Sequence, residues 1–353
     1  KLEISECFNN FFASIGPNLA SSINTDGKKP FHHYLSPKTS HQFQFKLLND
    51  EDIFKIMQNF APKSSTGYDG ISMKLLKHIS PHIIPALTIT VNQSLLTGIF
   101  PDHLKIAKII PLYKKSDETL LDNYRPISLL PTISKIFEKA VFKQLYDYFE
   151  ENKLFYESQF GFRKGHSTEL ACLELIDKIT EELDKGHVPI AIFLDLSKAF
   201  DTLDHTILLS KLQHYGIQDT PLKWFESYLS NRYQFVEFDN THSSKLRVST
   251  GVPQGSILGP LLFIIYMNDI CNVTKLFKPT LFADDTSLSS PLFILNNPNT
   301  ESQNKIGNLN RELDKISDWL AVNMLSLNVS KTKYMIFHIY QRKLNLDPLS
   351  DLK

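Results

Sequence analysis

Leu281-Phe-Ala-Asp-Asp-Thr-Ser-Leu288 decides the fold, because two adjacent acids stand between apolar residues in a run that otherwise has the character of a β-strand. A buried or half-buried ionised carboxylate is tolerated only when it is paired or bound to a metal, and aspartate is depleted in strands. Successive strand residues point to opposite faces of a sheet, so both acids can serve one site only where the chain bends. We therefore expect Asp284 and Asp285 at the tip of a β-hairpin, directed at divalent cations.

A third acid ends the apolar run Val188-Pro-Ile-Ala-Ile-Phe-Leu-Asp195. A nearly continuous apolar strand is typical of one that is buried on both faces or lies in the centre of a sheet. An acid at the end of such a strand and a pair at a hairpin bend can bring three carboxylates together at one end of a sheet. An isolated Asp-Asp pair is more often a solvated turn, but together with Asp195 the pair favours a metal site.

Three carboxylates at one end of a sheet suit two divalent cations about 3.5–4 Å apart, which activate an attacking oxygen and stabilise a leaving one in phosphoryl transfer. Mg²⁺ is the expected ion because it prefers oxygen ligands and substrate phosphates, and Mn²⁺ is the alternative. The scattered cysteines Cys7, Cys172 and Cys271 show no metal-ligand spacing and fit a reducing compartment.

Composition bounds the class of protein. The chain has 353 residues, of which 42% are hydrophobic, so it can bury a sizeable core. Lys+Arg and Asp+Glu both number 38, so the net charge is zero and contacts to nucleic acid must be local. No signal peptide and no apolar run near the roughly 18 residues of a membrane span is recognisable. We expect an intracellular fragment of a longer chain, nuclear or cytoplasmic, without a membrane partner.

Helical and strand-like periods alternate along the chain. Asn49 offers an N-cap for the first firm helix, and strands over 105–115 and 124–130 form a basic hairpin. Another hairpin is expected over 233–249, followed by an apolar helix and then the acidic hairpin. This order favours a mixed α/β (α+β) fold in which helices flank an antiparallel sheet, rather than a doubly wound sheet.

Five segments resemble, in order and spacing, motifs of reverse transcriptases, in particular those of the non-LTR (LINE-type, jockey-like) retrotransposon branch. The three that resemble palm motifs are Phe193-Leu-Asp-Leu-Ser-Lys-Ala-Phe-Asp201, Gly251-Val-Pro-Gln-Gly-Ser-Ile-Leu-Gly-Pro260 and Phe282-Ala-Asp-Asp285. The two that resemble fingers motifs are Asn123-Tyr-Arg-Pro-Ile-Ser-Leu-Leu130 and Gly161-Phe-Arg-Lys-Gly-His-Ser-Thr168. In this family many members have tyrosine where Phe282 stands.

The resemblance implies the fingers and palm of a right-hand polymerase, with the thumb largely missing. Residues 1–48 would be an N-terminal extension and linker, and 49–187 a fingers-like region with part of the palm. Residues 188–340 would be the palm with the catalytic motifs, and 341–353 a tail at the start of the missing thumb. Nothing in the sequence resembles the endonuclease that is expected in a full-length element.

The same resemblance implies roles for individual residues. Asp195, Asp284 and Asp285 would bind two Mg²⁺ ions and act in catalysis, with the Leu196 carbonyl as a further ligand. Phe200 matches the bulky residue that clashes with a ribose 2′-hydroxyl and so selects deoxynucleotides, since that hydroxyl distinguishes RNA from DNA. Taken alone, Phe200 fits a core aromatic equally well.

Two further regions match motif residues. Gln254 would line the nucleotide pocket, and Gly255 would permit close approach of the backbone to nucleic acid, although alone they fit an ordinary tight turn. Arg163 and Lys164 would contact the template backbone, because phosphate contacts position a strand without reading its sequence. Lys331 would act in catalysis by protonating the leaving pyrophosphate, with a surface lysine as the alternative.

The basic hairpin matches the residues that hold the incoming triphosphate. Arg125 offers a bidentate fork to phosphate oxygens. Lys115 is its expected companion, with Lys114 or Lys108 nearby. For each of these residues alone, a solvated hairpin face is the simpler interpretation.

The function implied is that of an RNA-directed DNA polymerase of a non-LTR retrotransposon, which adds dNTPs to a primer 3′-OH by two-metal-ion phosphoryl transfer. Its partners would be an RNA template, a DNA primer or target, and dNTPs. Two other functions stay open: a catalytically inactive RNA-binding remnant of a truncated retroelement polymerase, and a two-metal nuclease. The nuclease is disfavoured because Phe200 and the Gln254 loop have no role in it.

Overall fold

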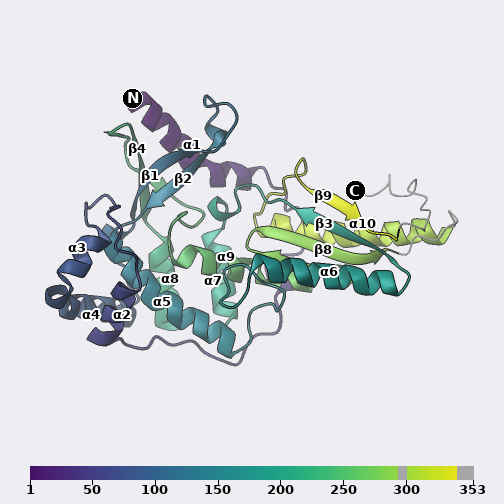
Figure 1. The fold of residues 1–353 in the computed structure, drawn as a ribbon, viewed down its shortest axis with the longest axis horizontal. Helices are drawn as coiled ribbons and strands as arrows, with labels where there is room; N and C mark the ends of the chain where they lie inside the picture. The colour runs from purple at the N-terminus through teal and green to yellow at the C-terminus, as the bar shows by residue number, and fades with distance from the viewer. Residues whose placement is uncertain (293–299, 340–353) are drawn as a thin grey trace. The chain divides into compact units, whose positions relative to one another are not determined.

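The computed structural model describes residues 1–292 and 300–339 (Figure 1). The chain forms two compact units, each assembled from segments that are separated in the sequence. The first unit consists of Lys1–Ser21, Lys38–Leu154 and Phe200–Phe263, and the second of Ser22–Pro37, Phe155–Ala199 and Ile264–Lys353. The fingers and palm ranges expected from the sequence stay a prediction, and the expected tail at 341–353 lies outside the described residues.

Helices of the first unit begin and end at residues with capping chemistry. Asn49 and Asp52 form a capping box at the start of α2, which confirms the expected helix there. Gly98, in the left-handed conformation, ends α4. The helices are α1 (Leu2–Ser21), α2 (Asp50–Gln58), α3 (Met73–His78), α4 (Ser80–Thr97), α5 (Thr132–Glu151), α7 (His205–His214), α8 (Asp219–Leu229) and the start of α9 (Leu258–Met267).

The sheet of the first unit has the strand order β2-β1-β4-β5, and β6 also pairs with β4. β1 is antiparallel to β2, which confirms the expected basic hairpin, and parallel to β4. Alternation along β1 places Ala107 and Ile109 on the buried face and Lys108 on the other. The strands are β1 (Ile106–Tyr113), β2 (Tyr124–Leu129), β4 (Arg232–Phe238), β5 (Thr241–His242) and β6 (Leu246–Val248).

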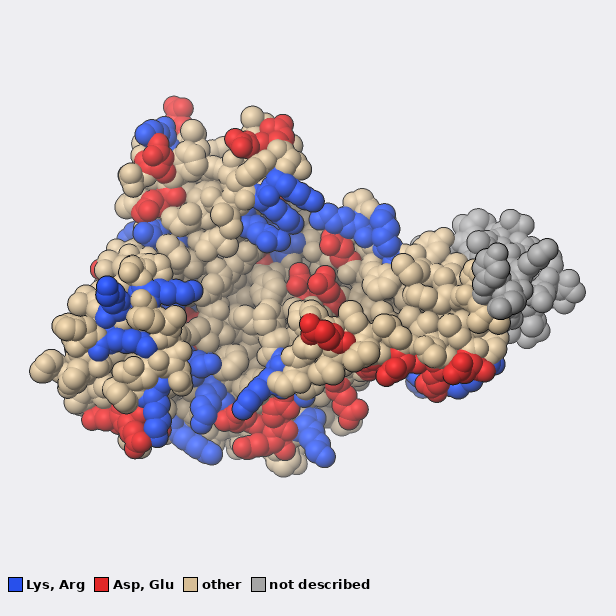
Figure 2. Space-filling view, in the orientation of Figure 1, with Lys and Arg blue, Asp and Glu red and all other residues tan. Residues whose placement is uncertain are grey.

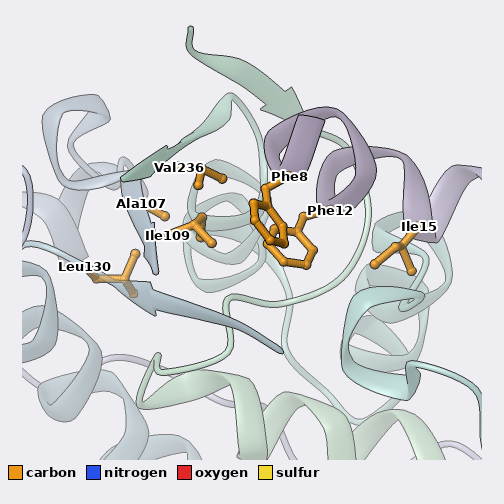
Figure 3. Close-up of a cluster of buried hydrophobic side chains, with 7 residues drawn as sticks. All are labelled: Phe8, Phe12, Ile15, Ala107, Ile109, Leu130 and Val236. Carbon is orange, nitrogen blue, oxygen red and sulfur yellow. The ribbon is translucent and has the colours of Figure 1, made fainter. Parts of the chain in front are cut away.

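Helix α1 packs on β4, β5 and β6 and contributes to a hydrophobic core (Figure 3). Burying a large apolar side chain contributes about 1.5–3 kcal/mol, so the three that α1 buries are a substantial share of the stability of this unit. Gly16 brings the helix close to Thr250, since a Cβ at this position would overlap the threonine hydroxyl. The amphipathic start of the chain is thus part of a core, whose buried members are Phe8, Phe12, Ile15, Ala107, Ile109, Leu130 and Val236.

The second unit contains an antiparallel sheet with the order β7-β8-β3-β9. The antiparallel sheet that the sequence predicts is therefore present. Val188, Ile190 and Ala191 of β3 are buried, as the continuous apolar run indicates for a strand with neighbours on both sides. The strands are β3 (Val188–Leu194), β7 (Lys278–Phe282), β8 (Asp285–Leu292) and β9 (Lys333–Ile336).

Helices of the second unit flank this sheet. α6 (Thr168–Asp184) packs on β3, β7 and β8 and runs along them in Figure 1. The side chain of Lys178 on α6 donates to the Thr280 hydroxyl of β7 at 3.0 Å. On α10 (Thr300–Val322) the buried indole of Trp319 donates to Asp269 at 2.8 Å.

The surface carries charges of both signs. Figure 2 shows acidic and basic side chains in separate small groups, and neither sign covers the visible face. This pattern agrees with the equal numbers of acidic and basic residues in the sequence. Among the described residues, no helix has the length and apolar character needed to cross a membrane.

Candidate functional site

The acidic pair lies at the tip of a β-hairpin in the second unit. Phe282 at the end of β7 pairs with Asp285 at the start of β8, so Ala283 and Asp284 form the two-residue connection. Ala283 has φ +59°, which a hairpin turn requires and which an L residue adopts only when its surroundings enforce it. The hairpin expected from the sequence is confirmed.

The register of β3 on β8 brings the third acid to the same edge of the sheet. Leu194 at the end of β3 pairs with Thr286, so the next position of this register sets Asp195 across from Asp285. Residues directly opposite in an antiparallel pair have side chains on the same face. Asp195 therefore lies at the same edge of the sheet as the hairpin tip.

A shared cation site for the three acids stays a prediction. Within residues 1–292 and 300–339, no group of three or more His, Cys, Asp or Glu side chains is arranged to hold a metal ion. The donor chemistry fits Mg²⁺, because the edge offers carboxylate oxygens. The side chain of Asp195 is 39% exposed and Asp285 is exposed, so an ion that keeps several of its waters can reach them.

The main chain of Asp195 is hydrogen-bonded to the turn that follows Leu327. Its carbonyl accepts from the Asn328 N–H at 2.7 Å, and its own N–H donates to the Thr332 hydroxyl at 3.4 Å. Nζ of Lys331 lies 3.7 Å from a carboxylate oxygen of Asp195. Lys331 is thus at the acidic edge, where the sequence places it, and its role as a proton donor stays a prediction. Leu196, the suggested carbonyl ligand, bridges to Leu327 in the same turn.

Ser158 to Gly161 forms a support for the hairpin that sequence reasoning missed. The Phe160 N–H donates to the Leu281 carbonyl at 2.7 Å, and the Leu281 N–H donates to the Ser158 carbonyl at 2.9 Å. A Cβ at Gly161 would overlap the nitrogen of Ala283, so only glycine fits here. The signal available in the sequence is this glycine, which opens the segment that resembles a fingers motif.

Arg163 holds that loop together. Its guanidinium donates to the carbonyls of Tyr156 at 3.1 Å and Gln159 at 3.4 Å, and it lies over the ring of Phe155 at 5.2 Å from the centroid. Lys164 is exposed. Contact of either residue with a template stays a prediction, and Arg163 has a structural role besides.

In the first unit, the loop over 251–255 packs on the chain that follows Phe200. Nε2 of Gln254 donates to both carboxylate oxygens of Asp201, at 2.9 and 2.8 Å. The Gly251 N–H donates to the Leu203 carbonyl at 2.8 Å, and a Cβ at Gly251 would lie 2.7 Å from the Phe200 carbonyl oxygen. The amide of Gln254 is therefore oriented by Asp201.

His205 reinforces this loop from α7. Its Nε2 lies 2.7 Å from the Gly251 carbonyl, so the ring donates from this nitrogen. Burial lowers the pKa of His205 below its ordinary value, because the charged ring would lose its hydration. Asp201 and His205 were both missed from the sequence, although Asp201 ends the motif that begins at Phe193.

Phe200 stacks on Phe263, with ring centroids 4.4 Å apart and planes 22° from parallel. It is half-buried. The Val252 N–H donates to its carbonyl at 2.9 Å, so the residue is held by the same loop as Gln254. Both interpretations from the sequence remain compatible with this position, since the ring has a packing partner and an exposed part.

The expected triphosphate ligands lie at different positions on the basic hairpin. Arg125 is exposed and pairs with Leu112, on the face of the sheet that also carries Lys108. Nζ of Lys108 lies 3.3 Å from a carboxylate oxygen of Glu237, so a triphosphate would have to compete with Glu237 for this ammonium group. Lys114 and Lys115 are exposed at the end of β1. Binding of triphosphate by any of them stays a prediction.

The loop and the hairpin are joined through β2. The Ser128 N–H donates to the Gln254 carbonyl at 2.9 Å, and a Cβ at Gly255 would lie 2.6 Å from the Ser128 oxygen. Gly255, with φ +128°, therefore serves close approach of two protein backbones. Contact of Gly255 with nucleic acid stays a prediction.

A buried carboxylate fixes the start of α9. Glu138 on α5 is fully buried, and one of its oxygens accepts from the N–H groups of Ile257 at 2.7 Å and Leu258 at 3.2 Å. Negative charge at a helix N-terminus is stabilising because it compensates unpaired N–H groups. Sequence reasoning missed Glu138, although an acid on the apolar face of a helix was a usable signal.

Known proteins match most of the chain. Residues 113–346 match the family model described as "Reverse transcriptase (RNA-dependent DNA polymerase)". The "Probable RNA-directed DNA polymerase from transposon BS" of Drosophila melanogaster is 31% identical over 301 residues, which are 81% of this chain and 32% of that protein. The "RNA-directed DNA polymerase from mobile element jockey" of Drosophila funebris is 28% identical, over 84% of this chain and 33% of that protein. The chain spans about a third of the length of these relatives.

Proposed function

Because the chain belongs to the reverse transcriptase (RNA-dependent DNA polymerase) family, we propose that it adds deoxynucleotides to a primer 3′-OH along an RNA template. The resemblance to non-LTR retrotransposon polymerases that the motifs indicate is confirmed by the jockey relative. The observation that carries the proposal is the β3–β8 register, which sets Asp195 opposite the hairpin of Asp284 and Asp285.

Asp195, Asp284 and Asp285 would hold two Mg²⁺ ions, or Mn²⁺, with the Leu196 carbonyl as a further ligand. Bound there, the ions would supply activation of the attacking 3′-oxygen and stabilisation of the leaving oxygen. Asp195 follows strand β3, and Asp284 and Asp285 lie at the turn between β7 and β8. Because paired strands hold these residues, the carboxylates would need to move little when a charged substrate binds.

Lys331 is proposed to hold a proton on Nζ beside Asp195 and to donate it to the leaving pyrophosphate. The distance of 3.7 Å to Asp195 supports this role, because it sets Nζ beside one of the proposed metal ligands. General acid catalysis contributes about 10²–10⁴-fold, so Lys331 would assist rather than carry the reaction.

Residues of the first unit are proposed to bind the nucleotide. Gln254, oriented by Asp201, would contact the sugar and base, and Phe200 would exclude a 2′-hydroxyl. Arg125 and Lys115, with Lys114, would bind the triphosphate, and Lys108 is a weaker candidate because Glu237 lies beside it. Template backbone contacts are assigned to Arg163 and Lys164, and Gly255 would let nucleic acid approach the loop.

Primer extension on an RNA template tests the proposal. We expect Mg²⁺-dependent incorporation of dNTPs by the wild type, and a loss in Asp284→Asn larger than the roughly 10–100-fold typical of residues outside the metal shell. Asp314→Asn, an exposed aspartate on α10, is the matched control and should keep full activity. Equal extension by wild type and Asp284→Asn would refute the proposal.

Nucleotide choice provides a second arm of the same experiment. Phe200→Ala should raise the incorporation of ribonucleotides relative to deoxynucleotides by roughly tenfold, the range that a change of shape in an apolar pocket produces. RNA binding that Asp284→Asn leaves unchanged, with no extension under any condition, would instead favour the inactive RNA-binding remnant.

A further inference from the structure

A buried glutamine supports the acidic hairpin of the second unit. Gln159 is 1% exposed, and its Oε1 lies 2.9 Å from the Gly161 nitrogen and 3.3 Å from the Ala283 nitrogen. Both N–H groups donate to this one oxygen. Gln159 thus links its own segment to the first residue of the hairpin turn.

The main chain on either side holds the glutamine in place. Gln159 bridges to Leu281 in a parallel pairing, flanked by the hydrogen bonds of Phe160 and Ser158 to the same leucine. Gly161 then passes so close to Ala283 that no side chain fits between them. The segment therefore follows β7 to its end and stops at the turn.

The turn needs this support for two reasons. Ala283 is in the left-handed conformation, which is unfavourable for a residue with a Cβ. Ala283 is also only 5% exposed, so its N–H would be buried without a partner if the glutamine oxygen were absent. The bond from Ala283 to Gln159 offsets both costs.

The orientation of the amide is fixed by its neighbours. If oxygen and nitrogen were exchanged, the NH₂ group would face two N–H donors and no acceptor. In the orientation present, Nε2 is buried and has no hydrogen-bond partner among the described residues. The oxygen therefore carries the interaction.

We propose that Gln159 is a positioning residue for the acidic hairpin: its side-chain oxygen holds Ala283 and thereby sets where Asp284 and Asp285 present their carboxylates. The inference rests on the proposed function of these acids as metal ligands. Gln159 itself is buried and acts through the main chain of the turn.

Two variants and two readouts test the proposal. Gln159→Met keeps the length of the side chain and removes the acceptor. Amide hydrogen exchange over 281–286 reports the turn, and electron paramagnetic resonance of added Mn²⁺ reports the metal ligands. Gln144→Met is the matched control, because Gln144 likewise bonds a chain segment through its amide, at Lys46 in the first unit.

We expect Gln159→Met to lose at least tenfold of the exchange protection at the turn and to weaken Mn²⁺ binding about 10–100-fold, as loss of an outer-shell partner does. Gln144→Met should change neither. A merely structural role would lower stability in Gln159→Met without a selective change in Mn²⁺ affinity.

Three outcomes would overturn the inference. They are exchange protection at the turn that Gln159→Met leaves unchanged, Mn²⁺ affinity that Gln159→Met leaves unchanged, and a loss in Gln144→Met as large as in Gln159→Met. Wild-type protein that binds no Mn²⁺ would remove the metal site and the inference together. Neither readout requires polymerisation, so a failure of primer extension with the expected pattern of binding would reject the proposed function alone.

Discussion

The acidic hairpin of the second unit and the Gly251–Gly255 loop of the first unit are held in different ways. The hairpin rests on strand pairing and on a parallel segment beside β7, so its supports are main-chain groups and one neutral amide. The loop rests on main-chain bonds and on two ionisable side chains, Asp201 and His205. The proposed metal ligands are thus positioned without titration, whereas the proposed nucleotide contact is positioned by groups whose charge can change.

Gly161→Ala is expected to have the largest effect, because it forces the hairpin away from its support. The added Cβ would overlap the Ala283 nitrogen, and overpacking of this kind costs about 1–3 kcal/mol. Primer extension should fall more than about tenfold, and unfolding of the second unit, followed by Trp319 fluorescence in a Trp224→Phe background, should shift accordingly.

Gly307→Ala provides the control for that substitution. Gly307 lies on α10 in the same unit, and a Cβ there meets nothing within 4 Å. It should be neutral or stabilise by up to about 1 kcal/mol, because alanine is the better helix former. If both alanines behave alike, the hairpin does not depend on close approach of the segment.

Asp201→Asn should affect the loop by a smaller amount. Asparagine keeps one acceptor for Gln254 and loses the charge, and a hydrogen bond to a charged group is worth about 1.5–3 kcal/mol. We expect a roughly three- to tenfold rise in KM for dNTP with little change in kcat. In a double-mutant cycle, Asp201→Asn should add almost nothing to Gln254→Met, because Asp201 acts through the amide that this variant lacks, and full additivity would show that the two side chains do not act together.

Acid should weaken the first unit through His205. Its pKa is lowered by burial, so the neutral ring contributes stability above the unfolded pKa of about 6.5 and that contribution is lost as pH falls through the lower folded value. His205→Gln, which can still donate to Gly251, should cost about 1 kcal/mol at pH 7.5 and flatten the loss between pH 6.5 and 5. Urea unfolding followed by Trp224 fluorescence, in a Trp319→Phe background, measures both.

An unchanged acid slope in His205→Gln would assign the acid sensitivity to another group. The hairpin turn provides an internal comparison, because Gln159, the side chain that bonds Ala283, does not titrate. Exchange protection over 281–286 should therefore be independent of pH from 5 to 7.5 after correction for intrinsic exchange rates.

Alkali should have the smallest effect, on the second unit. Burial raises the pKa of Tyr156 to about 12, and its hydroxyl donates to the Pro279 carbonyl at the start of β7 at 3.0 Å. The stability that the neutral phenol contributes is complete below pH 10 and is lost as pH rises toward 12. Tyr156→Phe should cost about 1 kcal/mol at neutral pH and reduce this alkaline slope, and an unaltered slope would exclude Tyr156 as its source.

Local features of the fold were predictable from the sequence, and long-range contacts were not. Alternation and the energetic cost of buried acids sufficed to predict the hairpin at Asp284, and cap chemistry sufficed for the start of α2 at Asn49. The bond from Ala283 to Gln159 joins residues 124 positions apart. No periodicity encodes such a pair, because either residue alone fits an ordinary loop.

In the candidate site too, individual residues were predictable from the sequence, but the side chains that contact them were not. Motif resemblance named Gln254, but the side chain that orients it, Asp201, requires knowledge of how the loop packs on η4 (Ala199–Asp201). Lys108 is a second example of a long-range contact that the sequence does not reveal. Its place on the basic hairpin was predictable, but its neighbour Glu237 belongs to β4, whose parallel pairing with β1 the sequence did not indicate.

That parallel pairing, together with the packing of α1 on β4, has a consequence for the order of events during translation. The apolar side of α1 is made before the strands that cover it, β4 and β6, which end at Phe238 and Val248. At about 5–20 residues per second, a nascent chain leaves Phe8 and Phe12 uncovered for on the order of 10–50 s. The first unit can therefore close only after β6 has been made, and until then the apolar side of α1 lacks its covering strands.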